Sequence, residues 1–276
     1  MKRQKERKKG KIRELKEVIR RDRPVFAVYV VLRLAVLTAL MMSFLRGEYE
    51  HAALCTLVLI LFLVPGFIQK NFGIELPSTL QIIILLFIFA AEILGELQCY
   101  FIQYPHWDTL LHTTSGFLFA AVGYSLVDLL NRNERFRFQL SPLYLALVAF
   151  CFSMTIGVLW EFFEFGMDRL FLLDMQKDTV VQSITSVMLD ETNSNIPVTI
   201  AGITDVAVNG ESLGFAGYLD IGLYDTMEDL FVNFLGALIF SLIGYFSAKR
   251  QEKNRIVDNL VPRLPKTREA EPEQGK

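Results

Sequence analysis

Residues 142–166, PLYLALVAFCFSMTIGVLWEFFEFG, form a long apolar run that contains no charged residue before Glu161. An α-helix rises about 1.5 Å per residue, so about 20 apolar residues span the hydrocarbon core of a bilayer. Open sheet or irregular chain at that depth would leave backbone N–H and C=O groups without hydrogen-bond partners. The run is therefore predicted to be a transmembrane helix.

Five further runs have the same character, so the sequence predicts an all-α multi-pass membrane protein with a six-helix transmembrane bundle. The composition agrees, because 52% of the residues are hydrophobic and the mean hydropathy is +0.35, yet 21% are charged. The charge must therefore be segregated from the membrane-spanning segments. The predicted transmembrane domain covers 24–247, with helices at 24–45, 51–68, 78–98, 108–130, 142–166 and 225–247.

A basic tail precedes the first helix. Residues 1–23 hold 12 Lys and Arg against 4 Asp and Glu, a balance of 12 − 4 = +8. Because this tail adjoins an apolar run, anionic lipid is the expected partner and nucleic acid is not. Apolar residues recur at helical spacing within 11–22, so this part is predicted to lie on the membrane as an amphipathic helix. A solvated tail that only sets the topology explains the pattern equally well.

The distribution of Lys and Arg predicts the orientation. The loops 69–77 and 131–141 and the tail 248–276, predicted to be disordered, contain basic residues. By contrast, 99–107 has none, and the insert 167–224 has two against eight acidic residues. The positive-inside rule then places both termini in the cytoplasm and the insert outside.

The insert is predicted to form a small extracytoplasmic β-hairpin cap. Its segment 197–208, PVTIAGITDVAV, is rich in β-branched residues. Asn209-Gly210 follows directly, and this pair favours a tight turn.

Four of the predicted helices carry acidic residues toward one end, although an ionisable residue costs about 2.5–3.5 kcal/mol at the membrane centre on insertion scales. Within a helix they recur every three or four residues, so each set occupies one face. From the helix rise and the alternating helix directions, all four sets lie toward the outer end of the membrane. The sets are Glu92/Glu96, Asp108/His112, Glu161/Glu164/Asp168 and Asp225/Asp229/Asn233.

Seven carboxylates of these sets and one imidazole cannot all carry charge in a low-dielectric setting without compensation. Oxygen ligands with one imidazole suit Mg²⁺, Mn²⁺ or Ca²⁺ and are also compatible with Zn²⁺ or Fe²⁺. We therefore predict a divalent metal ion as cofactor. Its predicted ligands are Asp108, His112, Glu161, Glu164, Asp225 and Asp229.

Other polar residues are predicted to support the site. Glu96 is a spare carboxylate that could act as the catalytic general base. Arg33, in the first helix, is either a counter-ion for the acidic residues or snorkels toward the basic tail. Asp178 either lies on the surface of the insert or folds back over the site. The remaining supporting residues are Glu92, Asn233 and Asp168.

Three functions fit this pattern. The first is a metal-dependent enzyme that acts on a lipid-linked or envelope substrate at the outer leaflet. The second is an ion-coupled transporter or permease, in which the same residues bind a proton or a monovalent ion. In the third, a structural or sensory protein, the acidic layer only fixes helix packing. A separate interpretation, without any ion site, is that the acids simply cap helix ends at the interface. Helix capping explains Asp108 and Asp225 better than Glu161, Glu164 or His112.

Three blocks on separate helices resemble the YjdF-like family of bacterial membrane proteins: WDTLLHTTSGF (107–117), WEFFEF (160–165) and DTMEDLFVNFLGA (225–237). The resemblance covers about 80–247 and implies a bacterial cytoplasmic-membrane location. It supports the topology and the choice of site residues, and it implies no reaction. The acid-x3-His and Asp-x3-Asn-x2-Gly-Ala spacings are more loosely similar to VanZ-like membrane proteins, although Thr109 stands where those proteins have a basic residue.

Overall fold

The computed structural model describes residues 22–131, 140–250 and 254–262, and it contains six spans long and apolar enough to cross a membrane. The predicted six-helix transmembrane bundle is therefore confirmed. The predicted surface helix at 11–22, apart from residue 22, and the chain after residue 262 lie outside the described residues. The spans are Arg23–Arg46, Tyr49–Phe72, Ser78–Leu97, Trp107–Leu130, Pro142–Phe171 and Leu223–Arg250.

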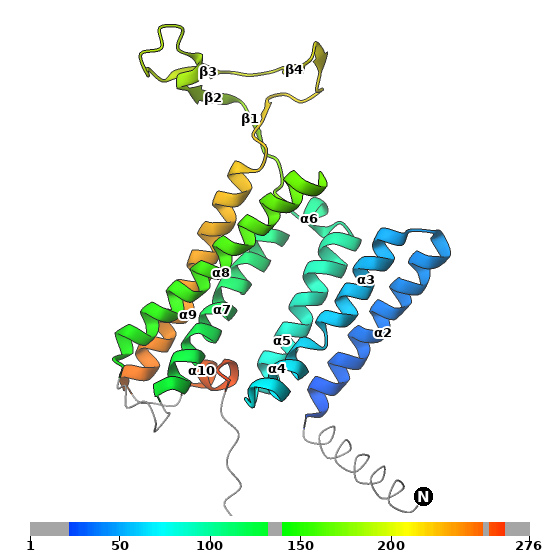
Figure 1. Cartoon of the computed structure of the whole chain (residues 1–276), viewed down its shortest axis with the longest axis vertical. Helices are drawn as coiled ribbons and strands as arrows, with labels where there is room; N and C mark the ends of the chain where they lie inside the picture. The colour runs from blue at the N-terminus through cyan, green and yellow to red at the C-terminus, as the bar shows by residue number, and fades with distance from the viewer. Residues whose placement is uncertain (1–21, 132–139, 251–253, 263–276) are drawn as a thin grey trace, which may run out of the picture.

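The spans form two groups that lie side by side (Figure 1). The first group contains α2 (Arg23–Arg46), α3 (Tyr49–Leu61), α4 (Val64–Phe72), α5 (Ser78–Ile88) and the π-helix η1 (Phe89–Leu97). The second contains α7 (Trp107–Asn131), α8 (Pro142–Phe171) and α9 (Leu223–Arg250), which pack against one another. A short helix, α6 (Tyr100–Gln103), connects the groups.

Two spans depart from the predicted single regular helices. The second span breaks between α3 and α4, where Pro65 lies in the first turn of α4 and has no N–H to continue the ladder. The third span changes from α5 to the π-helix η1 and ends before Cys99, which has a left-handed φ of 57°. A π-helix has i→i+5 hydrogen bonds, so side chains along η1 do not follow the α-helical spacing used to predict their level.

Small residues allow α7 and α9 to approach closely. A Cβ added to Gly236 of α9 would lie 2.1 Å from the backbone oxygen of Thr113, and one added to Gly116 of α7 would lie 2.3 Å from that of Asn233. Asn233 is buried, and its Nδ2 donates to the Met154 sulfur of α8 at 3.5 Å. In a membrane, where lipid is as apolar as the helix surface, such close contact drives helix association.

Gly236→Ala should destabilise the bundle by about 1–3 kcal/mol, the usual cost of overpacking, because the backbones of α7 and α9 must move apart. Thermal unfolding in detergent measures this. Gly66→Ala in α4 is the matched control, since an added Cβ there meets no atom within 4 Å. Equal unfolding temperatures for the two variants would contradict the close-packing interpretation.

The insert between α8 and α9 forms three separate two-stranded antiparallel sheets. Strand β1 (Val180–Val181) pairs with β6 (Tyr218–Leu219), and β2 (Ser183–Ser186) pairs with β3 (Val198–Ala201). Strand β4 (Ala207–Val208) pairs with β5 (Glu211–Ser212) around Asn209-Gly210, so the predicted turn is confirmed. The strand expected over 197–208 is interrupted after Ala201. Its first part, β3, pairs with the preceding strand β2 and not with the strand that follows.

A compact loop lies between β2 and β3. The Asp190 carboxylate accepts hydrogen bonds from the Thr192 hydroxyl and from the amides of Thr192, Ser194 and Ile196. These donors, the Thr192 hydroxyl foremost, lower the pKa of Asp190 to about 2. The insert is thus an ordered structure beyond the ends of α8 and α9 (Figure 1).

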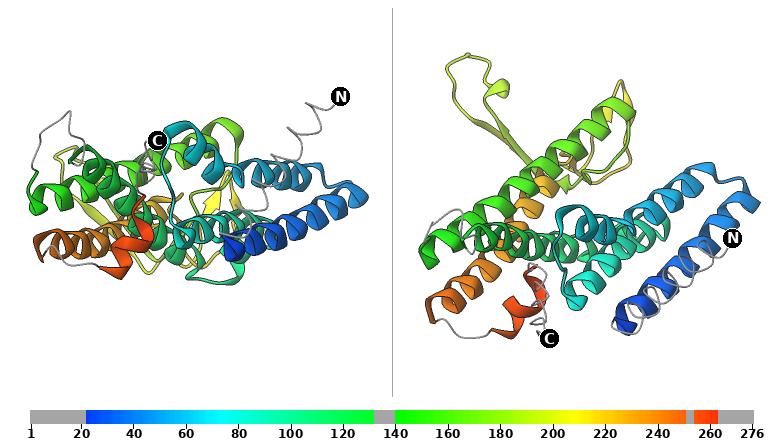
Figure 2. Two further views of the ribbon diagram at one scale, coloured as in Figure 1. Left: turned by 90° about the horizontal axis from the view of Figure 1, so that it is seen from below. Right: turned by 60° about the horizontal axis from the view of Figure 1, so that its bottom comes forward.

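A final helix closes the opposite end of the bundle. Residues 248–276 were expected to form a disordered tail, but α9 extends to Arg250 and α10 (Arg255–Leu260) packs against α5, α7 and α9. Leu260 and Val261 are buried in the same hydrophobic cluster as Phe240. In the view from below, α10 lies beside α9 under the bundle (Figure 2). Apolar spacing in RIVDNLV explains why this segment docks.

Candidate functional site

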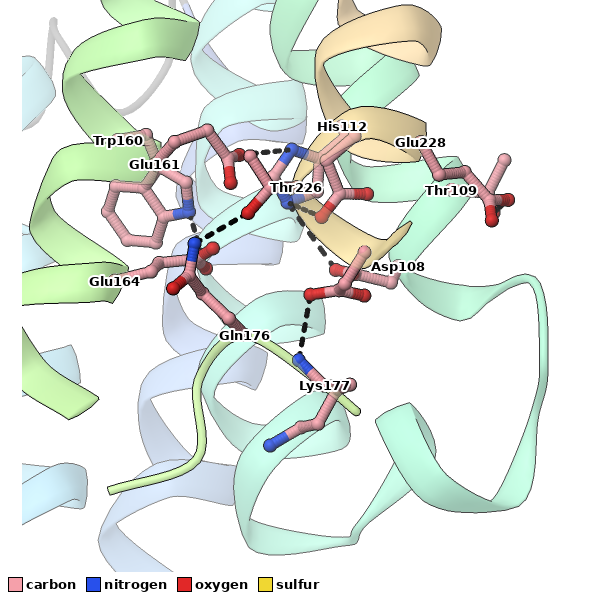
Figure 3. A network of polar contacts seen from close by, with 12 residues as sticks. Asp108, Thr109, His112, Trp160, Glu161, Glu164, Gln176, Lys177, Thr226 and Glu228 are labelled. Carbon is pink, nitrogen blue, oxygen red and sulfur yellow. Dashed lines mark hydrogen bonds and ion pairs between the residues drawn. The ribbon is translucent and has the colours of Figure 1, made fainter. Parts of the chain in front are cut away.

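Acidic side chains and one imidazole from α7, α8 and α9 meet at the end of the bundle that carries the insert (Figure 3). Potential ligand atoms of Asp108, His112 and Asp229 lie within 4.8 Å of one another, and so do those of Glu161, Glu164 and Asp229. These five residues are called the acidic cluster below. Asp229 belongs to both triads and is its central member.

His112 lies among three carboxylates of the cluster. Its Nε2 is 3.5 Å from Oδ1 of Asp108 and 3.6 Å from Oδ2 of Asp229, and its Nδ1 is 4.0 Å from Oε1 of Glu161. The exposed fraction of the side chains falls from 29% at Asp108 to 12% at His112 and about 5% at Glu161 and Asp229. The cluster is therefore partly exposed at Asp108 and buried at its centre.

Three carboxylate oxygens at the buried centre of the cluster have no hydrogen-bond donor among the described residues. They are Oε2 of Glu161, Oε2 of Glu164 and Oδ2 of Asp229. The other Glu164 oxygen, Oε1, accepts from the Trp160 indole at 2.8 Å. A buried polar atom without a partner is costly, and a buried unpaired charge more so. One carboxylate oxygen of each of these three residues lies within 4.8 Å of the other two, a spacing that suits a shared cation or shared protons.

A short segment, 174–177, crosses over the cluster and is called the strap below. Asp168 accepts hydrogen bonds from the strap amides of Met175 at 2.6 Å and Gln176 at 2.9 Å. Asp225 Oδ2 accepts from the Lys177 amide at 2.8 Å, and the Gln176 side chain donates to the Thr226 hydroxyl. The strap is thus fixed to the ends of both α8 and α9.

Two acidic residues, Asp168 of α8 and Asp225 of α9, therefore fix the strap through hydrogen bonds from its backbone amides. Asp168 was predicted to support the site, and its carboxylate accepts hydrogen bonds from two backbone amides of the strap. Asp225 was predicted as a ligand, but one of its oxygens is engaged by Lys177 and the residue is outside both triads. Both lie at the ends of their helices, where carboxylates can reach the amides of a returning loop.

The remaining predicted residues lie away from the cluster. Glu96 is exposed and Glu92 half-buried on η1, and neither belongs to a triad. Arg33 is on α2 in the other helix group. Its guanidinium donates a hydrogen bond to the Tyr29 hydroxyl and lies over the Tyr29 ring. Asp178 is exposed just beyond the strap, and its pKa is raised by partial burial and by the neighbouring carboxylates of Asp174 and Asp220. Asn233 is buried one turn below Asp229.

Sequence reasoning did not identify the role of four residues that surround the cluster. Trp160 could have been found, because it precedes Glu164 by one helical turn and its indole can donate to that carboxylate. Gln176, Lys177 and Thr226 could not, since their positions depend on how the insert folds back over the helix ends.

The fold and the cluster together define a six-span helical membrane protein with a buried acidic and histidine cluster near one end of the bundle. The chain belongs to the family described as "Predicted membrane protein (DUF2238)", which matches residues 28–250. The YjdF-like resemblance points to this family, whereas the looser similarity to VanZ-like proteins stays a prediction. No curated protein and no solved structure matches the chain.

Proposed function

We propose that the protein is a divalent-cation-dependent membrane enzyme whose acidic cluster binds Mg²⁺, Mn²⁺, Ca²⁺ or Zn²⁺. It would lie in the bacterial cytoplasmic membrane with both termini in the cytoplasm, so that the cluster faces the outer leaflet. The alternation of basic loops supports this orientation. The substrate class that suits this place is a lipid-linked or envelope compound.

The observation that carries the proposal is the set of three buried carboxylate oxygens, contributed by α8 and α9, for which the described part of the chain provides no donor. Replacing their hydration requires either a cation or bound protons. Oxygen ligands in this number suit a hard divalent ion, and an ion among Glu161, Glu164 and Asp229 would leave His112 free. An ion in the other triad would instead take His112 as a nitrogen ligand, which Mn²⁺ and Zn²⁺ also accept. The two triads share Asp229, so the ion has two alternative sets of three ligands.

Hydrolysis is the reaction class that this arrangement serves best. A bound cation polarises a phosphoryl or carbonyl oxygen and favours attack by water. The water oxygen bonds to phosphorus or carbon, the ester P–O or C–O bond breaks, and a base carries the water's proton to the leaving oxygen. With a cation among Glu161, Glu164 and Asp229, His112 is better placed for this than the exposed Glu96.

Ion-coupled transport is less well supported, because the bundle beyond the cluster is closely packed. Gly236 is in contact with α7, and both the next residue, Ala237, and Phe240, one turn further on, are fully buried. At the far end, α10 packs across α5, α7 and α9. This packing favours a pocket that is open near one membrane surface over a pathway through the membrane.

The test has two steps: Mn²⁺ binding to the purified protein, and then Mn²⁺-dependent conversion of a bacterial lipid. Glu161→Gln should weaken Mn²⁺ binding, measured by EPR of the free ion, by at least about tenfold, the lower range for loss of a residue that merely supports a site. Purified wild-type protein with Mn²⁺ should then deplete one class of a bacterial lipid extract, as measured by mass spectrometry. Glu228→Gln, an exposed neighbour of Asp229, should behave as wild type. A folded protein that binds no Mn²⁺ would refute the proposal.

A further inference from the structure

Trp160 connects the acidic cluster with the exposed surface of the bundle. Trp160 donates its indole N–H to buried Glu164 at 2.8 Å, yet Trp160 itself is 44% exposed. Its ring packs against Phe163, whose side chain is also exposed on α8. On a membrane-spanning helix an exposed apolar face meets acyl chains, so one indole lies between those chains and the carboxylate.

The aqueous side of the cluster is built differently. Water reaches Asp108, whose side chain is 29% exposed, but the strap covers the helix ends through backbone hydrogen bonds to Asp168 and Asp225. Displacing the strap requires several such bonds to break, whereas turning one indole breaks a single hydrogen bond. Trp160 and Asp108 lie on opposite sides of the cluster (Figure 3).

We propose that the substrate is a membrane lipid with a phosphate-bearing headgroup, which reaches the cluster sideways past Trp160 while water reaches it at Asp108. The inference rests on the proposed cation site, because a divalent ion held by carboxylates completes its coordination with phosphate oxygens. Headgroup and water then approach the ion from opposite sides. The acyl chains stay in the bilayer beside the aromatic face of α8.

The two tryptophans of the chain make this testable by fluorescence. Trp107→Phe leaves Trp160 as the only tryptophan, and Trp107→Tyr serves if the first variant does not fold. Each is reconstituted in nanodiscs of phosphate-free digalactosyl lipid. Mn²⁺, a paramagnetic quencher, should quench Trp160, which tests the cation site alone.

A brominated lipid, whose bromine atoms quench a nearby tryptophan, then tests whether the lipid binds beside Trp160. Mg²⁺ is the cation in this experiment because it does not itself quench. Brominated phosphatidylglycerol should quench Trp160 more strongly when Mg²⁺ is added, and Glu161→Gln should abolish that gain. Brominated galactolipid should show no gain, and soluble glycerol phosphate should not suppress the one seen with phosphatidylglycerol.

Each contrary result identifies what fails. Without Mn²⁺ quenching, the cation site and the lipid inference both fail. With Mn²⁺ quenching but equal Mg²⁺ effects for the two brominated lipids, Trp160 touches only bulk lipid, and the inference alone fails. Suppression by glycerol phosphate would replace the lipid with a soluble phosphate ester.

Discussion

Asp229→Asn should weaken divalent-cation binding more than any other single change in the cluster. Asp229 is the residue shared by both ligand triads, and it is almost fully buried. Loss of a residue that only supports a metal site typically costs 10–100-fold in affinity, so loss of a shared ligand should exceed about 100-fold. Mn²⁺ titration followed by EPR measures the change.

Two variants on the same helix give the matched comparison. Glu228→Gln removes an exposed charge next to Asp229, and its Mn²⁺ affinity should equal that of wild type. Asp225→Asn weakens the hydrogen bond from the Lys177 amide in the strap, so its Mn²⁺ affinity should lie between those of wild type and Asp229→Asn. If Asp229→Asn and Asp225→Asn lower the affinity equally, Asp225 is a ligand after all and the assignment drawn from the triads is wrong.

Glu164→Gln should reverse its effect on stability when a divalent cation is added. Without cations, the substitution removes a carboxylate that adds like charge to Glu161 and Asp229, so the variant should be at least as stable as wild type. With Mn²⁺ at 100 times its dissociation constant, wild type gains about 2.7 kcal/mol. The variant binds weakly and gains little, so wild type becomes the more stable protein.

Thermal unfolding with EDTA and with Mn²⁺ measures this reversal, and Mn²⁺ should raise the wild-type unfolding temperature by about 5–10 °C. The amide retains the oxygen that accepts from Trp160, so the indole contact is preserved in the comparison. An equal loss of stability with and without Mn²⁺ would mean that Glu164 serves helix packing and binds no cation.

The parts of the structure that depend on local sequence were predictable. Apolar length gave the six spans, and Asn209-Gly210 gave the β4–β5 turn. Spacing of three and four residues placed Glu161, Glu164 and Asp229 on the inner faces of α8 and α9, where the structure brings them together. Each of these inferences needs only the periodicity of one helix or one turn.

Several predicted site residues lie outside the cluster because of features that one helix cannot reveal. The π-helix η1 changes the register of Glu92 and Glu96. Arg33 belongs to a helix group that packs apart from the cluster, and no spacing within α2 shows this. The strap that occupies Asp225 is fixed by contacts across about 50 residues of chain, between Lys177 and α9. Pairing of β3 with β2 likewise depends on the loop organised by Asp190.

The most direct test is the location of a bound ion. Crystals of the protein grown with Mn²⁺ should give an anomalous scattering peak within coordinating distance of Glu161, Glu164 and Asp229, and the peak should vanish in Asp229→Asn. A well-ordered cluster without an anomalous peak, its carboxylates bridged by protons or by water alone, would contradict the account.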